Sequence, residues 1–144
     1  MADLPCLEFA DHSEVAHGVG LKWLTATAQR ALPQVLAVAF SDSPLIGLRE
    51  VEFTLVNDQT IARVHREFMQ VSGATDVITF HHGEVLISVE TAMTQALDYG
   101  RSTSQEVALY IIHGLLHLAG YKDNTSEEFE TMAKLQEHIL QACD

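Results

Sequence analysis

His113 and His117 lie four residues apart in an apolar stretch that reads His-Gly-Leu-Leu-His-Leu-Ala-Gly-Tyr-Lys-Asp over residues 113–123. Residues four apart on an α-helix share one face, with Cβ atoms about 5–6 Å apart, so both imidazoles can reach one metal ion at ~2.0–2.1 Å. Gly120 can end the helix in a left-handed conformation. The chain that turns back there can bring Asp123 in as a third ligand. Three protein ligands leave a coordination position for water or substrate, as in a catalytic metal site.

A core histidine hydrogen-bonded within the protein is the ordinary alternative for each of these residues. Two buried imidazoles are harder to explain in this way, because an unpaired buried polar group costs on the order of 1–3 kcal/mol and a shared metal ion would satisfy both. The spacing also matches the H-x-x-x-H-x-x-G-x-x-ligand order of a metzincin-type metal helix. Residue 114, however, is Gly where zinc proteases place the Glu that acts as general base. The spacing therefore predicts a metal-binding helix in a protein that is not a zinc protease. We expect Gly114 to leave room beside the metal for a large substrate.

Composition and charge narrow the class of protein. The chain has 144 residues, of which 47% are hydrophobic, and this predicts a single domain over residues 1–144. The net charge of −12, from 20 acidic and 8 basic residues, argues against non-specific binding to nucleic acid. A local basic groove is still compatible with this charge, and its candidates are Arg63, Arg66, Arg101 and Lys122.

The ends of the chain and its cysteines indicate the compartment. Residues 1–5 have neither the basic start nor the apolar segment of a signal peptide, and no run approaches the ~18 apolar residues that span a bilayer. Cys6 and Cys143 favour two free thiols in a reducing environment over a terminal disulfide. We therefore expect a cytoplasmic protein with no membrane partner.

Hydrophobic periodicity predicts an α/β (α+β) fold with a single mixed sheet of about four strands and about five helices. Expected strands cover residues 3–10, 49–56, 75–80 and 84–89. Expected helices cover residues 19–40, with Pro33 breaking the helix or starting a new one, then the segment after Asn57 or Asp58, residues 91–99, and two segments that begin with capping boxes at Thr103-x-x-Glu106 and Thr125-x-x-Glu128. We expect residues 41–47 to form a loop, Phe68 to face inward on its helix, and Phe129, Met132, Leu135 and Ile139 to face inward on the last one.

Residues 113–121, His-Gly-Leu-Leu-His-Leu-Ala-Gly-Tyr, resemble the motif H-G-x-L-H-L-x-G-Y-D-H of the YbeY family of bacterial endoribonucleases. The similarity extends to Thr-Asp-Val-Ile-Thr-Phe at 75–80, Gly-Glu-Val-Leu-Ile-Ser at 83–88, Gln-Ala-Leu-Asp-Tyr-Gly at 95–100 and residues 127–132. It covers roughly residues 50–140 and implies a mixed sheet with a metal in a cleft at the HxxxH helix. It also implies a metal-dependent hydrolase of single-stranded RNA that acts in ribosomal RNA maturation and ribosome quality control, with ribosomal components as partners.

The resemblance assigns the metal to His113, His117 and Asp123, with zinc expected and another divalent transition metal as the alternative. The Asp-His pair of the motif becomes Lys122-Asp123 here, so that Asp replaces the third histidine. A carboxylate lowers the charge of a divalent site from +2 to +1, which should make bound water less acidic and favour harder ions.

Two further positions depart from the family pattern. The family's cleft arginine, six residues before the Thr-Asp-Val strand, corresponds to Met69, and Arg66 one helical turn earlier is the nearest candidate to stabilise the phosphoryl oxygens. The proline after that strand corresponds to His81, a candidate general base, although exposed turn residues are the favoured reading of His81 and His82.

Three functions remain open at this point. The leading one is a metal-dependent endoribonuclease, whose nucleophile is either water activated at the metal or the RNA 2′-hydroxyl. The second is a catalytically weakened or non-enzymatic relative that associates with ribosomes and keeps the fold. A hydrolase for another substrate, such as a peptide, is the third, and Gly114 argues against it.

Overall fold

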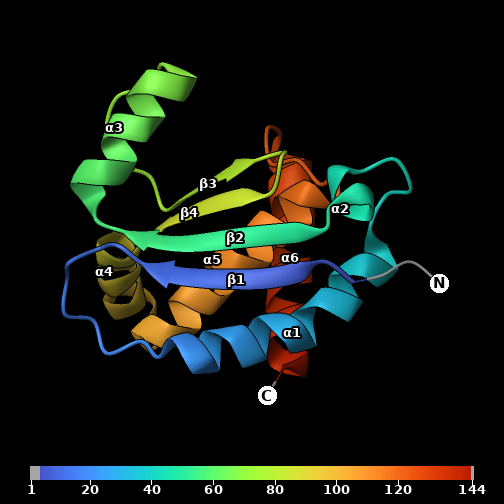
Figure 1. Ribbon diagram of the computed structural model, residues 1–144, viewed down its shortest axis with the longest axis horizontal. Coiled ribbons are helices and arrows are strands. Elements are labelled where there is room, and N and C mark those ends of the chain that lie inside the picture. The colour runs from blue at the N-terminus through green and yellow to red at the C-terminus, as the bar shows by residue number, and fades with distance from the viewer. Residues whose placement is uncertain (1–3, 144) are drawn as a thin grey trace.

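The computed structural model describes residues 4–143 and contains one mixed sheet of four strands (Figure 1). The strand order is β1 (Cys6–Asp11), β2 (Glu50–Val56), β4 (Glu84–Ser88) and β3 (Val77–Phe80). β2 runs parallel to both β1 and β4, whereas β3 is antiparallel to β4. The mixed four-stranded sheet is therefore confirmed. The strand expected over residues 3–10 is β1, and residue 3 lies outside the described residues.

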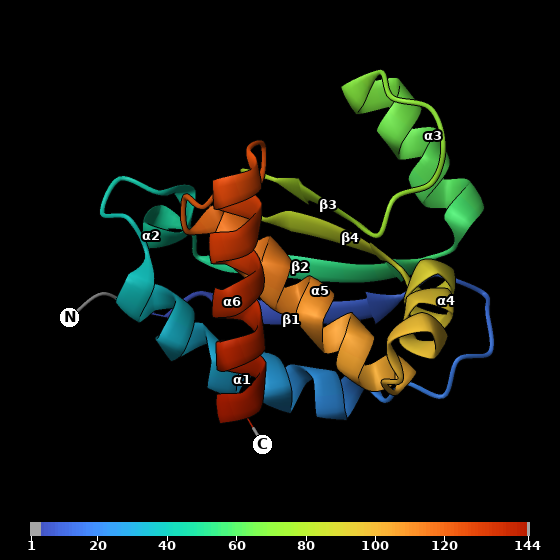
Figure 2. The same cartoon turned by 180° about the vertical axis from the view of Figure 1, so that it is seen from behind.

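Six helices accompany the sheet within residues 4–143: α1 (Leu21–Val38), α2 (Pro44–Gly47), α3 (Asp58–Met69), α4 (Val89–Tyr99), α5 (Thr103–Leu118) and α6 (Ser126–Ala142). α1 and α5 pack on one face of the sheet, with α4 and α6 on either side of α5 (Figure 2). α3 stands over the opposite face, against β3 and β4. The helix beyond the expected five is α2, a single turn in the segment predicted as a loop. Pro44 is pre-organised for its first position, and Leu45 is buried there.

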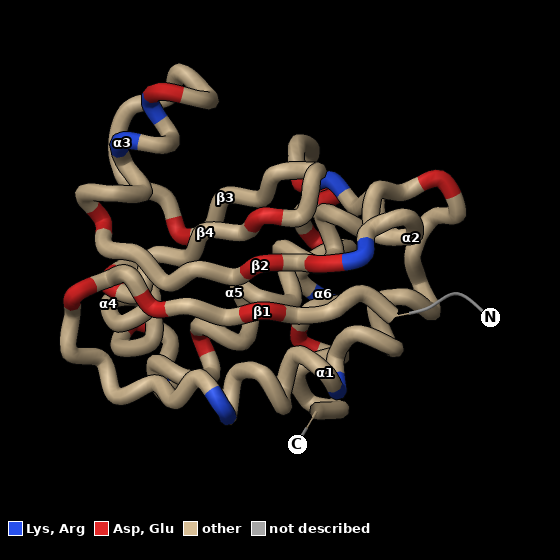
Figure 3. Tube along the Cα trace, viewed as in Figure 1, with Lys and Arg blue, Asp and Glu red and all other residues tan. Residues whose placement is uncertain are grey.

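The two faces of the sheet differ in what they bury. Val51, Phe53, Val85 and Ile87 point toward α1 and α5 and belong to the main hydrophobic core. The other face is only partly covered. There α3 buries just a small cluster, formed by Val56, Ile61 and Ile78. Beside that cluster, Glu8, Glu52 and Glu84 are direct neighbours across β1, β2 and β4 (Figure 3). This row of like charges destabilises the sheet slightly and makes its open face strongly acidic.

Tertiary packing overrides several local predictions. α1 continues through Pro33, because Pro33 lies on the exposed side of the helix and residues before and after it are buried in the same core. α5 begins one residue earlier than predicted, with a capping box between Ser102 and Gln105, and this releases Glu106 to be buried. The prediction that Phe68 and Phe129 face inward is wrong, since they are 68% and 61% exposed.

The predicted N-terminal caps of α3 and α6 are confirmed. Asn57 caps α3, Gly100 ends α4 in a left-handed conformation, and Thr125 and Glu128 form a capping box on α6. Cys6 is exposed and Cys143 is buried, and no disulfide joins them within the described chain. Between residues 4 and 143, no helix combines the length and apolarity needed to cross a bilayer.

Gly114 lies where α5 packs most closely on the sheet. A Cβ atom at this position would lie 2.9 Å from Cγ1 of Val85 and 3.3 Å from Oγ1 of Thr79. Gly114 therefore faces the sheet, and the expectation that it leaves room for substrate is wrong. Its missing side chain instead lets the helix that carries both histidines approach β3 and β4.

Gly114→Ala should lower the free energy of unfolding by about 1–3 kcal/mol, because the added methyl group would clash with the buried, β-branched side chain of Val85. Urea denaturation of the purified variant measures this change. Gly47→Ala is the matched control, because nothing lies within 4 Å of a Cβ built there, and it should be neutral or slightly stabilising. Equal stability of the two variants would contradict the close packing at Gly114.

Candidate metal centre

The C-terminal end of α5 is closed by a Schellman motif. The Gly120 amide donates to the His117 carbonyl and the Tyr121 amide donates to the Leu116 carbonyl, each at 3.0 Å. Gly120 has φ +103°, and a Cβ there would lie 2.8 Å from the Phe40 ring. Both constraints require glycine, as the sequence predicted. The motif turns the chain back along the helix.

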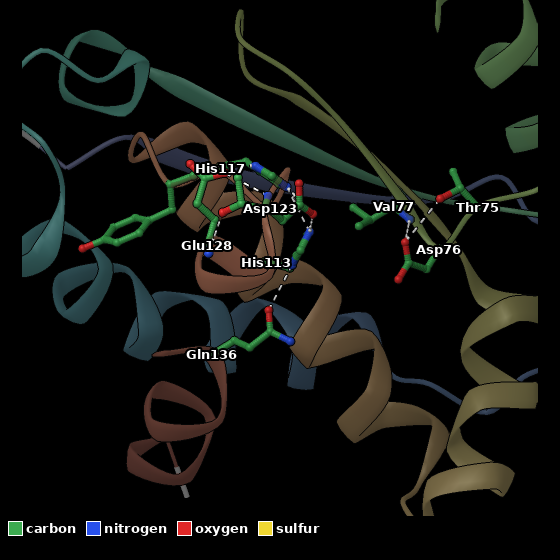
Figure 4. Close-up of polar contacts among 10 residues, drawn as sticks. Thr75, Asp76, Val77, His113, His117, Asp123, Glu128 and Gln136 are labelled. Carbon is green, nitrogen blue, oxygen red and sulfur yellow. Dashed lines mark hydrogen bonds and ion pairs between the residues drawn. The ribbon is translucent and has the colours of Figure 1, made fainter. Parts of the chain in front are cut away.

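His113, His117 and Asp123 converge at this turn (Figure 4). The two Nε2 atoms lie 3.0 Å apart. The Oδ2 atom of Asp123 lies 3.5 Å from each of them. The three side chains are 18%, 25% and 35% exposed, so the cluster is shielded but open on one side.

The remaining ring nitrogens fix how the histidines are oriented. Nδ1 of His117 lies 3.0 Å from the Tyr121 carbonyl oxygen, which can only accept, so this nitrogen carries the proton. Nδ1 of His113 lies 3.0 Å from Oε1 of Gln136 on α6 and donates to it. Both Nε2 atoms are therefore left as lone-pair acceptors that face each other and the Asp123 carboxylate. Second-sphere contacts of this kind orient the histidine ligands of metal sites.

The donor set fits a divalent metal ion. Three ligand atoms placed ~2.0–2.1 Å from one ion at tetrahedral angles lie roughly 3.3–3.4 Å apart, and the observed separations of 3.0, 3.5 and 3.5 Å lie on both sides of that value. Burial, followed by the neighbouring His113, lowers the pKa of His117 against the opposing effect of Asp123. A lowered pKa keeps this imidazole neutral, which is the form that binds a metal.

A hollow of about 340 Å³ opens beside His117 and Asp123, and we call it the His117 hollow. His81 and Lys122 also line it. A larger hollow of about 960 Å³ lies over the open face of the sheet and contains none of the three predicted ligands.

The four basic residues proposed for a groove do not gather in one place. Lys122 lines the His117 hollow, Arg101 pairs with Glu137, and Arg63 and Arg66 lie on α3 (Figure 3). Arg66 is exposed and is not among the residues that line the His117 hollow.

Comparison with known proteins identifies the family. The family model described as Endoribonuclease YbeY matches residues 19–144. Relatives with the same description are 35% identical over 143 residues in Myxococcus xanthus and 34% identical over 128 residues in Moorella thermoacetica. The first alignment covers 88% of this chain but 46% of the relative, and the second covers 76% of this chain and 82% of the relative. The chain belongs to the YbeY family.

The YbeY fold is also found in a solved structure. The solution structure of TM1509 from Thermotoga maritima matches with a TM-score of 0.62 and 19% sequence identity, over 95% of this chain and 88% of that chain. At this identity the likeness shows the fold alone. It agrees with the mixed sheet and helices described above.

The YbeY motif residues at 113, 117 and 123 are brought together as predicted, whereas the parts played by His81 and Arg66 stay predictions. His81 is exposed in the turn after β3 and also lines the His117 hollow. It is therefore both an exposed turn residue and a group at the cleft. Sequence reasoning missed Gln136. It lies four residues after Met132 and three before Ile139, both buried, and a polar residue on that apolar face was the available signal.

His117→Ala should empty the metal centre, because it removes one of three ligands, whereas Asp123→His should keep a metal bound, because it replaces one ligand with another. Elemental analysis of proteins purified in parallel measures this. His138→Ala, an exposed position on α6, controls for loss of an imidazole. Full metal content in His117→Ala would contradict the assignment, and an empty Asp123→His protein would contradict the geometry at residue 123.

Gln136→Leu should weaken metal binding by about 10- to 100-fold, since it leaves Nδ1 of His113 without its acceptor. Competition with a chromophoric chelator measures the affinity. Gln141→Leu on the exposed side of the same helix should bind as tightly as the unaltered protein. Equal affinities in both variants would show that the Gln136 contact does not orient the ligand.

Proposed function

We propose that this protein is a metal-dependent endoribonuclease that cuts single-stranded RNA and acts in ribosomal RNA maturation and ribosome quality control in the cytoplasm. Membership of the YbeY family supports RNA as the substrate, since its relatives are described as endoribonucleases. The observation that carries the proposal is the convergence of the two Nε2 atoms and the Asp123 carboxylate on one point beside an open hollow.

Zinc is the ion that suits these ligands best. Two imidazoles and one carboxylate are a familiar zinc donor set in hydrolases, and other divalent transition metals accept the same atoms. When bound, the ion supplies Lewis-acid polarisation of a phosphoryl oxygen and lowers the pKa of water beside it. Asp123 reduces the net charge of the centre relative to three histidines, so the ion would be a weaker electrophile.

Residues of the chain would orient the ligands, bind the phosphate and transfer a proton. Gln136 and the Tyr121 carbonyl hold the two imidazoles with Nε2 facing the centre. Lys122 lines the same hollow and offers positive charge to a phosphate. His81 also lines this hollow and would accept or return a proton there. Arg66 could join only through a substrate long enough to reach α3.

Charge also favours one direction of approach for the RNA. The open face of the sheet carries Glu8, Glu52 and Glu84 side by side, which repels a phosphate backbone. The metal centre lies at the end of α5, the helix that packs on the opposite face. An RNA strand would therefore reach the centre from the helical side.

A non-catalytic relative that associates with ribosomal components is the second candidate. The position of Arg66 favours it, because this arginine is not among the residues that line the His117 hollow. Such a protein would keep the fold and the metal without cutting RNA.

The metal-loaded protein should cut an unstructured oligoribonucleotide but not the same strand in a duplex, and a chelator should abolish the cutting. His113→Ala should reduce cleavage to background because the ligand set is broken, whereas His138→Ala should cleave as the unaltered protein does. Gel analysis of end-labelled RNA measures this. Cleavage that survives both the chelator and His113→Ala would refute the proposed site. Binding to ribosomal subunits without cleavage would favour the non-catalytic candidate.

A further inference from the structure

A third hollow borders His113. It has a volume of about 260 Å³, and most of its lining residues belong to α4, α5 and α6. Figure 2 shows α4 and α6 on either side of α5. We call it the Glu106 hollow. His113 lines it, whereas His117 and Asp123 line the His117 hollow, so the metal ligands lie between the two.

The floor of the Glu106 hollow contains buried polar groups with incomplete partners. Glu106 and Tyr110 are each 6% exposed. The Tyr110 hydroxyl faces the Glu106 carboxylate but does not reach the geometry of a regular hydrogen bond with it, and burial and then that carboxylate raise the pKa of Tyr110. Nε of Arg101 lies 3.9 Å from the Glu106 carboxylate, while the end of the same guanidinium pairs with Glu137. Buried groups of this kind require a partner.

A second carboxylate, that of Asp76, lines the hollow together with the amides of Gln95 and Gln136. Asp76, just before β3, contributes to the raised pKa of both Glu106 and Tyr110, after burial and nearer groups. One Asp76 oxygen already accepts from the Val77 amide. The hollow therefore attracts a ligand with N–H donors and repels a phosphate.

The rims of the hollow are aromatic. Tyr99 at the end of α4 is 67% exposed, and Phe129 in the first turn of α6 is 61% exposed. Both line the hollow. Exposed aromatic rings beside single-stranded nucleic acid serve as stacking platforms for bases.

We propose that the Glu106 hollow binds one nucleobase of the RNA strand whose phosphate lies at the metal centre, with Tyr99 or Phe129 stacking on the base and the carboxylates reading its edge. Guanine fits this lining best, because its Watson–Crick edge presents adjacent N1–H and N2–H₂ donors that one carboxylate can accept together. Uracil fits it worst, because two carbonyl oxygens flank its only N–H. This inference rests on the proposed function and adds a base preference to it.

The test uses metal-loaded protein and nonamers of uridine in which one guanosine is moved along the strand. Cleavage should follow the guanosine at a fixed offset, and KM should be at least fivefold lower than for the all-uridine strand. Phe129→Ala should raise KM on the guanosine strands by roughly five- to a hundredfold, and Phe129→Tyr, which keeps a ring, should not. Glu106→Gln and Tyr110→Phe should each reduce the preference for guanosine over uridine.

Leu97→Ala is the control for a surface change on α4, because Leu97 is 85% exposed and does not line the hollow. Metal content and thermal unfolding of every variant separate folding defects from recognition. Cleavage with no base preference, or with the same preference in Glu106→Gln and Tyr110→Phe, would overturn the inference and leave the endoribonuclease in place. If nothing is cut, fluorescence anisotropy decides: guanosine-selective binding that depends on Phe129 supports the hollow without the hydrolase, and no binding refutes both.

Discussion

Three lone-pair acceptors meet at one point in this protein, and much of the surrounding structure holds them there. The Nε2 atoms of His113 and His117 are 3.0 Å apart, with the Asp123 carboxylate 3.5 Å from each. Because both Nδ1 atoms donate elsewhere, none of the three has a proton to offer, and the arrangement is unfavourable without a cation. The folded protein already contains this unfavourable cluster of acceptors. Metal binding should therefore stabilise the folded state as well as complete the site.

Contacts from the sheet, from the turn after α5 and from α6 hold these acceptors in place. Gly114 lets the helix sit close against Val85 and Thr79, which fixes its position on the sheet. The Schellman turn at Gly120 presents the Tyr121 carbonyl to His117 and returns the chain toward Asp123. α6 then supplies Gln136 to His113. Stability and the candidate chemistry therefore depend on the same few residues, and α5 cannot shift without disturbing the ligands.

Local rules of helix and strand formation account for the parts of this fold that the sequence predicts well. Alternating residues indicate the strands, and the spacing of His113, His117, Gly120 and Asp123 predicts the ligand cluster, because helix geometry and a glycine turn place all four. The structure differs from the prediction at Pro33, Thr103 and Phe129, because the outcome there depends on which side of a helix meets the core. Gln136 is harder still: periodicity tells which face it occupies, but only the packing of α6 on α5 gives it His113 as a partner.

The acidic character of the chain constrains how the proposed endoribonuclease can recognise RNA. Proteins that bind nucleic acid through the backbone alone depend on many Lys and Arg contacts. Here the basic residues are few and are spread over α1, α3, α6 and the connections between elements. A divalent ion beside Asp123 and Lys122 can neutralise one phosphate, but not a long stretch of backbone. Binding energy must then come from the bases, through stacking and edge contacts that do not depend on positive charge. The aromatic rims and carboxylate floor of the Glu106 hollow offer both kinds of contact next to His113. The carboxylates of such an endoribonuclease would weaken its binding to the RNA backbone. Inside the Glu106 hollow, the same kind of group would give it a base preference.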